Sequence, residues 1–285
     1  MAIPYGVASM VAPLQHVLVQ RPNAAFGGAY DDPACGYLRP VDLEVATKEH
    51  ESFCELLTSL GVAVHQLNAD SPYPDQIYTY DPALVTIEGA ILLRSGKPGR
   101  RGEERFLADW FRANDIPIVG RIAEPGTVDG GDVLWLRPDL IAVGRSLRTN
   151  QAGIDQLIPM LDVDVRVFDL PYAGGPAACL HLMSTLSMIT DDLALVERPR
   201  LPAGLHSLLE DLGVEMLDTP PGEVDSLGTN VLAVRPGIAV AVEGNPETQR
   251  LLESRGVTVY TFGGDQIAIN GTGGPTCLTR PVVRT

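Results

Sequence analysis

The sequence predicts an α/β propeller, a ring of five ββαβ modules. Two recurring patterns support this fold: an amphipathic helix followed by a strand appears five times, and two-stranded patterns lie between these copies. The two-stranded patterns begin near residues 83, 133, 182 and 231, a spacing of about 50 residues that is typical of repeat architectures. The last hairpin is divided between the two ends of the chain, so closing the ring completes it and removes exposed sheet edges. We therefore expect a single domain over residues 1–285.

Each module is expected to contain one helix followed by one strand. In the first module a helical pattern of apolar residues follows Asp42, and Gly61 suits a left-handed stop. Thr149 is predicted to cap the third helix, and Asn245 with Pro246 to begin the fifth. The predicted helix and strand pairs are 43–60 with 62–67, 103–113 with 116–119, 149–161 with 163–170, 202–212 with 214–217, and 246–255 with 257–262.

The hairpins are predicted from paired apolar runs that are separated by a turn signal. Glu88-Gly89 and Pro236-Gly237 are two of these signals. The fifth hairpin would pair the C-terminal segment 277–283 with the N-terminal segment 17–21. The four continuous hairpins are predicted over 83–94, 132–144, 182–197 and 230–244.

Composition and charge narrow the classes of function. The chain has 36 Asp and Glu against 21 Lys and Arg, a net charge of −15, and 6% aromatic residues. Nucleic acids require clustered positive charge, so we expect no nucleic-acid partner and favour a cationic small molecule. No apolar run approaches the roughly 20 residues of a membrane span, and residues 1–20 lack the features of a signal peptide. We therefore expect no membrane association and a cytoplasmic location, and a homo-oligomer remains open.

Four chemically potent side chains stand at matching positions of different modules. In such a ring, the segments that lead into the hairpins point toward the central axis. Asp81, Asp129, His181 and Cys277 occupy these module entrances. They are separated by 129 − 81 = 48, 181 − 129 = 52 and 277 − 181 = 96 residues, which correspond to one, one and two repeats. The pattern predicts that the four side chains converge on one site.

A nucleophile, a base and two carboxylates in one register indicate catalysis. Taken alone, a cysteine in an apolar segment is usually structural, and a histidine among Leu and Met is usually a hydrogen-bonded core residue. The shared register favours the catalytic interpretation. The remaining entrance, near Thr229 and Asn230, carries no comparable group. The other cysteines and histidines are interpreted as structural: Cys35, Cys54, Cys179, His16, His50, His65 and His206.

No metal and no organic cofactor is expected. The sequence has no HxH, HxxxH or CxxC motif that would bring two metal ligands together locally. The glycines at 271, 273 and 274 are not followed by a helix or an acidic residue, which argues against a dinucleotide site.

Five segments together resemble the guanidino-group-modifying (amidinotransferase-fold) superfamily: GTVDGGDVLWL, VGRSLRTNQAGIDQL, HLMSTLSMI, RSGKPGRRGEE and GGPTCLTRPVVR. Within it they are most similar to dimethylarginine dimethylaminohydrolases, the dimethylargininases. The resemblance spans nearly the whole chain and implies a propeller of five modules. It also implies hydrolysis of an Nω-methylated arginine to citrulline and methylamine or dimethylamine, through a covalent S-amidino-cysteine.

The resemblance assigns a role to each residue at the module entrances. It implies that Cys277 is the nucleophile, that His181 is the general acid and base, and that Asp129 orients His181. Asp81 would hold the substrate guanidinium. The residues that would bind the amino-acid carboxylate are Arg94 and Arg148.

These residue types suit guanidine chemistry. A carboxylate can accept two N–H groups of a planar guanidinium and fix its orientation. Attack on the central carbon needs a thiolate, which a cationic substrate and a nearby histidine favour. The histidine then donates a proton to the departing amine and takes one from the water that hydrolyses the intermediate.

The substrate is predicted from the two positions where the family's branches differ. Met183 stands two residues after His181, where arginine deiminases of this fold typically carry a carboxylate. An apolar neighbour suits an alkylated nitrogen, so Met183 is a predicted substrate contact and favours a methylated arginine. Tyr80, also predicted to bind substrate, stands where dimethylargininases usually carry an acid. The first alternative is an arginine deiminase or a hydrolase of another guanidino compound. An amidinotransferase and a non-catalytic binding protein are the others.

Overall fold

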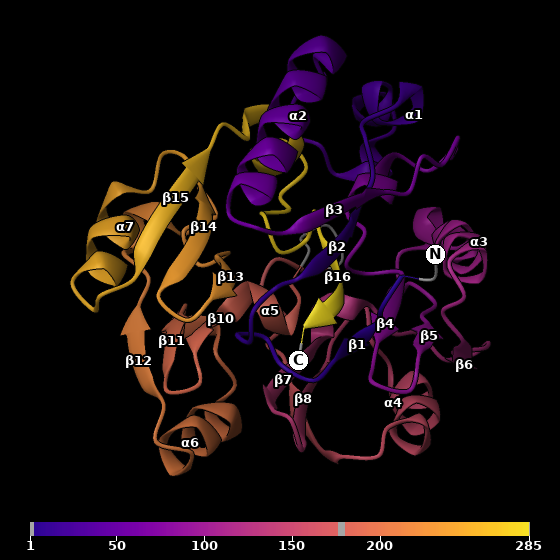
Figure 1. Ribbon diagram of the computed structural model, residues 1–285. Helices are drawn as coiled ribbons and strands as arrows, with labels where there is room; N and C mark the ends of the chain where they lie inside the picture. The colour runs from indigo at the N-terminus through magenta and orange to yellow at the C-terminus, as the bar shows by residue number, and fades with distance from the viewer. Residues whose placement is uncertain (1–2, 176–179, 285) are drawn as a thin grey trace.

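The computed structural model describes residues 3–175 and 180–284 and has the predicted α/β propeller fold (Figure 1). Its strands form five small sheets. In each sheet an antiparallel pair is extended by a strand that runs parallel to the second member of the pair. A helix connects these two parallel strands, because a parallel pair needs a crossover connection. This is the predicted ββαβ module.

Four of the modules are continuous in sequence. Their elements are β4 (Ala83–Val85), β5 (Ala90–Leu92), α3 (Glu103–Ala113) and β6 (Ile118–Arg121); β7 (Val133–Arg137), β8 (Leu140–Arg145), α4 (Gln151–Leu157) and β9 (Asp164–Asp169); β10 (Leu186–Thr190), β11 (Leu193–Val196), α6 (Ala203–Asp211) and β12 (Glu215–Asp218); β13 (Leu232–Arg235), β14 (Ile238–Val242), α7 (Pro246–Glu253) and β15 (Thr258–Phe262).

The fifth module joins the two ends of the chain. Its sheet has the order β1-β16-β2-β3, so the C-terminal strand lies between two N-terminal strands. The strand β16 runs parallel to β1 and antiparallel to β2. The prediction that the terminal segments meet in one hairpin is confirmed. The elements are β1 (Gly6–Val7), β2 (His16–Val19), α1 (Ala24–Gly27), α2 (Leu43–Ser59), β3 (Ala63–Gln66) and β16 (Arg280–Arg284).

Local sequence signals explain where several helices begin and end. The Asp42 carboxylate accepts hydrogen bonds from the N–H groups of Glu44 and Val45 and thereby caps α2. Gly61 follows the end of α2 with a φ of +90°, a left-handed conformation that favours glycine. The helix α3 has the predicted bounds at both ends. In the described part of the chain, no helix combines the length and apolar character needed to cross a membrane.

Several predicted boundaries are wrong, and three of them have an identifiable physical reason. Asn150, not Thr149, caps the third helix: its side chain accepts a hydrogen bond from the Gly153 N–H at 2.8 Å. The Thr149 hydroxyl instead accepts the N–H of Asp129. The strand predicted from residue 116 begins at Ile118, because the N–H groups of residues 114–116 still bond to the end of α3. The start of the predicted hairpin 182–197 is the short helix α5 (Leu182–Thr185), whose first turn is closed by a capping box.

The C-terminal strand also links neighbouring modules through two buried arginines. Arg280 donates from Nη1 to the carbonyls of Tyr80 at 3.0 Å and Ala83 at 2.6 Å, at the start of β4. Arg284 donates from Nη2 to the carbonyl of Ala233 in β13. Both side chains are almost fully buried. The strand that follows Cys277 is therefore fixed to the modules on either side of it.

Candidate active site

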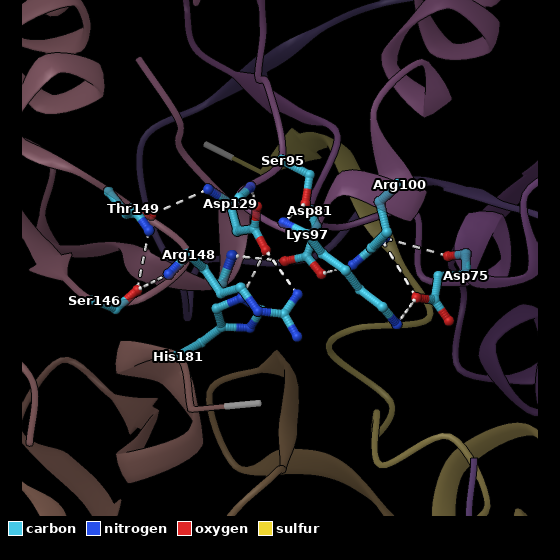
Figure 2. Close-up of polar contacts among 12 residues, drawn as sticks. Asp75, Asp81, Ser95, Lys97, Arg100, Asp129, Ser146, Arg148, Thr149 and His181 are labelled. Atoms are coloured by element: carbon cyan, nitrogen blue, oxygen red, sulfur yellow. Dashed lines mark hydrogen bonds and ion pairs between the residues drawn. The ribbon is translucent and has the colours of Figure 1, made fainter. Parts of the chain in front are cut away.

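The predicted residues Asp81, Asp129 and His181 meet in space (Figure 2). One polar atom from each side chain lies within 4.8 Å of the others. The three residues are 7%, 0% and 6% exposed, so their charges lie in a largely desolvated environment. They come from the entrances of three different modules, as the repeat spacing predicts.

Asp129 holds the His181 ring. His181 Nε2 lies 3.0 Å from Asp129 Oδ2, and Asp129 Oδ1 accepts the N–H of Gly96 at 3.0 Å. The Asp129 N–H donates to the hydroxyl of Thr149 at 3.1 Å. Gly131 makes room for the ring, because a Cβ at that position would lie 2.6 Å from His181 Nδ1. The carboxylate and the ring are therefore fixed in position relative to each other.

The Asp129 carboxylate is ionised at neutral pH. Burial by itself would raise its pKa, but the hydrogen bond and charge of His181, together with Arg100 and Arg148, lower this pKa to about 2. Arg148 Nη1 lies 3.6 Å from Asp129 Oδ2. A negative charge at this position can both select the orientation of the imidazole and stabilise its protonated form.

A second aspartate of the same segment, Asp132, bonds the residue that follows His181. Asp132 Oδ1 accepts the N–H of Leu182 at 2.8 Å, and Asp132 Oδ2 accepts the hydroxyl of Ser146 at 2.6 Å. Burial raises the pKa of Asp132 to about 6, although His181, these hydrogen bonds and that of Thr149 act in the opposite direction. The repeat register does not single out Asp132, because this residue begins the predicted hairpin rather than preceding it.

Asp81 is paired with an arginine of the chain itself. Arg100 Nη1 donates a short hydrogen bond to Asp81 Oδ2, and the Gly131 N–H donates to Asp81 Oδ1 at 2.9 Å. Arg100 also donates from Nη2 to Glu103 at 2.8 Å. Burial would lower the pKa of Arg100, but the carboxylates of Glu103, Asp81 and Asp75 raise it well above its usual value. Arg100 belongs to the RSGKPGRRGEE segment that carried part of the family resemblance, yet no role was predicted for it.

A further acidic group, Asp75, lies on the other side of Arg100 (Figure 2). Lys97 Nζ lies 2.5 Å from Asp75 Oδ2 and donates to the carbonyl of Cys35 at 2.8 Å. The hydroxyl of Tyr37 donates to Asp75 Oδ1 at 3.1 Å. Neither Asp75 nor Lys97 precedes the first strand of a hairpin, so the register of the repeats could not identify them.

Cys277 is half-buried in the turn that precedes β16, and its thiol has a side-chain partner from another module. Asn230 Nδ2 donates to Cys277 Sγ at 3.3 Å, and Asn230 Oδ1 accepts the N–H of Thr276 at 3.2 Å. Gly274 makes room for this asparagine, because a Cβ at 274 would lie 2.5 Å from Asn230 Cγ. The fourth entrance, which carries no group comparable to an aspartate, histidine or cysteine, thus places an amide against the Cys277 sulfur.

The two arginines predicted to bind a carboxylate lie in loops, Arg94 after β5 and Arg148 after β8, and the Arg94 carbonyl accepts the N–H of Val128, the residue before Asp129. Arg94 donates to the carbonyl of Gly126 at 3.2 Å and to Glu124 at 3.3 Å. Its side chain is 19% exposed, and that of Arg148 is 13% exposed. Both guanidinium groups therefore retain some access to solvent, in contrast to Arg100.

Tyr80 and Met183 lie in the hydrophobic core rather than with the charged cluster. The Tyr80 ring is 3% exposed; its hydroxyl contacts the Met10 sulfur at 3.5 Å and Arg280 stacks on its face. The structure does not bring the Tyr80 side chain to Asp81, although the two residues are adjacent in sequence. Met183 lines a small cavity together with Thr276, the residue before Cys277.

The other described cysteines lie in surroundings that disfavour the thiolate. Cys54 contacts His50 and Gln66, and burial raises the pKa of its thiol to about 11. Burial and the charge of Asp75 raise the pKa of Cys35. Cys179 lies outside the described residues.

The same cluster bears on metal binding. Asp81, Asp129 and His181 offer ligand atoms close enough together for a cation. However, Arg100 already pairs with Asp81, and Arg148 lies beside Asp129. Two arginines beside the carboxylates oppose a divalent ion. The arrangement is better suited to proton transfer and to the binding of a planar cation.

Comparisons with known proteins identify the family. Residues 71–209 and 205–284 match the family model described as arginine deiminase. The chain is 31% identical to an arginine deiminase from Mycobacterium marinum over 79% of its length, and covers 65% of that protein. It is 30% identical to a dimethylarginine dimethylaminohydrolase from Pseudomonas aeruginosa over 52% of its length, and covers 57% of that protein. It is 28% identical to an uncharacterised protein from Aeropyrum pernix, covering 93% of the chain and 94% of that protein.

Solved structures show the same fold. The enzyme from Pseudomonas aeruginosa in complex with citrulline superposes with a TM-score of 0.79 at 24% identity, covering 96% of this chain and 100% of that one. The product-bound N-terminal domain of a cyanobacterial arginine dihydrolase gives a TM-score of 0.82 at 18% identity, covering 94% of this chain and 97% of that one. At these identities the likeness concerns the fold, which supports many chemistries.

Proposed function

Because the chain belongs to the arginine deiminase family, whose relatives include hydrolases of guanidino groups, we propose that it hydrolyses an Nω-methylated arginine. The products are citrulline and methylamine or dimethylamine. The observation that carries this proposal is the meeting of Asp81, Asp129 and His181 within 4.8 Å. Such a site can bind a planar cation and exchange protons with it.

Asp81 is the proposed anchor for the substrate guanidinium. Its two oxygens accept one hydrogen bond each, from Arg100 and from the Gly131 N–H. A carboxylate has about four lone-pair positions, so Asp81 can accept further N–H groups from a ligand. Arg100 and Gly131 thereby fix the orientation of Asp81 without using its full capacity.

Cys277 is the proposed nucleophile. Its thiolate attacks the central guanidinium carbon and forms a C–S bond. His181 donates a proton to the alkylated nitrogen, the C–N bond breaks, and the amine leaves. Water then attacks the S-amidino carbon while His181 takes its proton. The C–S bond breaks, which restores the thiolate and releases citrulline. Asp129 orients His181 and stabilises its protonated form in both halves.

Arg94 and Arg148 are the proposed partners of the amino-acid carboxylate. Both are partly accessible cations near Asp129. Arg94 pairs with the exposed Glu124, a weak contact that a substrate carboxylate can replace. Arginine suits this role because its guanidinium can bind a carboxylate through two parallel hydrogen bonds.

Met183 supports a methylated substrate over plain arginine. It is an apolar residue two positions after His181, and its side chain lines a small cavity with Thr276, the residue before Cys277. Plain arginine would leave N–H groups facing apolar surface, at a cost of about 1–3 kcal/mol. The second candidate is an arginine deiminase, which the match to the arginine deiminase family model favours.

A competition assay tests the proposal. Equal concentrations of arginine and asymmetric dimethylarginine are placed in one vessel, and citrulline, ammonia and dimethylamine are measured. We expect kcat/KM for the methylated substrate to be about 10- to 100-fold higher, which corresponds to the energy above. Preferential loss of arginine with release of ammonia would instead support the deiminase. Cys277→Ser should abolish turnover, whereas the matched variant Cys35→Ser should retain it.

A further inference from the structure

The structure places a side chain against the proposed nucleophile that the sequence pattern did not identify. Asn230 Nδ2 donates to Cys277 Sγ at 3.3 Å. This distance is within the range of a hydrogen bond to sulfur. Asn230 stands two residues before β13, at the fourth module entrance, just as Asp81 stands two residues before β4.

Asn230 is held so that only its amide N–H faces the sulfur. Its Oδ1 accepts the N–H of Thr276 at 3.2 Å, and its backbone N–H donates to the carbonyl of Leu227 at 2.9 Å. A Cβ at Gly274 would overlap the Asn230 side chain, so glycine is needed there. The Asn230 amide therefore bonds two neighbouring residues, the Thr276 N–H through its oxygen and the Cys277 sulfur through its nitrogen.

A neutral donor in this position acts differently on the two forms of the thiol. A hydrogen bond from an amide N–H is stronger to a thiolate than to a neutral thiol, because the acceptor carries a full charge. It therefore favours ionisation of the cysteine. The same bond restricts rotation of the Cys277 side chain and aims the sulfur.

We propose that Asn230 is a positioning residue for Cys277, which stabilises its thiolate and fixes its direction of attack. The inference rests on the proposed role of Cys277 as the nucleophile. It adds the remaining module to the site, so that each of the five entrances contributes one side chain. Asn230 itself acts through the sulfur and exchanges no proton.

The test measures the alkylation rate of Cys277 as a function of pH, without substrate. Iodoacetamide labelling is followed at the Cys277 peptide by mass spectrometry. Asn230→Asp is the informative variant, because it keeps the oxygen that bonds Thr276, removes the donor and adds a charge that opposes the thiolate. Asn230→Leu removes both contacts in a side chain of similar shape. We expect the midpoint of the pH–rate profile to move upward by about one pH unit in both variants.

Asn245 is the control, since it is an asparagine whose side-chain hydrogen bonds join it to Ser226 and to the carbonyl of Val242 rather than to Cys277. Asn245→Asp should leave the midpoint unchanged. An unchanged midpoint in Asn230→Asp would overturn the inference, as would an equal shift in the control. If Asn230→Leu does not fold, Asn230→Asp decides alone. Because labelling needs no substrate, a wrong substrate assignment would appear in the competition assay and leave this result intact.

Discussion

At the scale of single residues, the site separates two carboxylates by their partners. Asp129 faces His181 and has a depressed pKa, whereas Asp81 faces Arg100 and a backbone N–H. This arrangement agrees with the proposed roles, in which Asp129 holds the catalytic base and Asp81 receives the substrate cation. Substitution of each should have a distinct kinetic effect.

Asp129→Asn should lower kcat on the order of 10³-fold with a small change in KM, because the imidazole loses the charge that orients and stabilises it. Asp81→Asn should raise KM as well as lower kcat, because the counter-charge of the substrate is lost. Steady-state kinetics with the methylated substrate measure both constants. Equal changes of KM in the two variants would show that this division of roles is wrong.

Asp132 gives a prediction about pH. Its pKa is about 6 in the folded protein and 3.8 in the unfolded chain. Below pH 4 the residue is protonated in both states. Between pH 4 and 6 only the unfolded chain loses the proton, so stability falls as pH rises across this window. Asp132→Asn should remove this slope, which amounts to about 3 kcal/mol at most. Urea unfolding of the parent protein and of Asp132→Asn at pH 4, 5, 6 and 7 measures this slope. Parallel dependence of the unfolding free energy on pH in the two proteins would contradict a raised pKa for Asp132.

At the scale of elements, the sequence predicted which helices and strands exist better than the residues at which they begin and end. The bounds of α3 follow from its apolar face and the acidic residues of its first turn, which are local signals. The cap of α4 does not follow from local signals, because Thr149 and Asn150 are both good capping residues. The Thr149 hydroxyl accepts the N–H of Asp129, which lies in another segment, and Asn150 therefore caps the helix. A tertiary contact therefore decided between two equal local signals.

Asn150 connects this helix to the segment that carries Asp129. Its Oδ1 accepts the N–H groups of Thr127 at 3.0 Å and Gly153 at 2.8 Å, and its Nδ2 donates to the carbonyl of Pro125 at 3.0 Å. Asn150→Ala should cost about 1–2 kcal/mol of unfolding free energy and also reduce kcat, because residues before Asp129 lose their anchor. Asn150→Asp keeps the acceptor and should lose less of both. Equal losses in the two variants would indicate that capping is not the cause.

At the scale of the whole molecule, the repeat spacing was sufficient to predict the ring of modules and the meeting of Asp81, Asp129 and His181. It was not sufficient for Arg100, Asp75 and Lys97, which form ion pairs with one another and with Asp81 and Glu103 but do not stand at module entrances. Nor could it place the Tyr80 ring, which contacts Met10 and Arg280 in contacts that arise only in the folded chain. Positions that recur from module to module could be predicted from the sequence, whereas contacts made by a single segment could not.

The closure of the fold depends on β16, and substitution of Arg280 in this strand tests that dependence. Arg280→Met would leave the carbonyls of Tyr80 and Ala83 without their buried donor, at a cost of about 2 kcal/mol. Arg137, an exposed arginine that donates to the carbonyl of Leu212, is the matched control, and Arg137→Met should change stability by less than about 0.5 kcal/mol. Denaturant unfolding compares them. A smaller loss of unfolding free energy in Arg280→Met than in Arg137→Met would show that the Arg280 hydrogen bonds do not stabilise the fold.

The covalent intermediate on Cys277 tests the central claim most directly. Enzyme is mixed with asymmetric dimethylarginine, quenched with acid within one turnover, and digested for peptide mass spectrometry. The account predicts an S-amidino adduct on the Cys277 peptide, with one equivalent of dimethylamine released before citrulline appears, and no adduct in Cys277→Ser. Turnover by Cys277→Ser at a tenth of the parent rate, or an adduct on Cys35 instead, would contradict it.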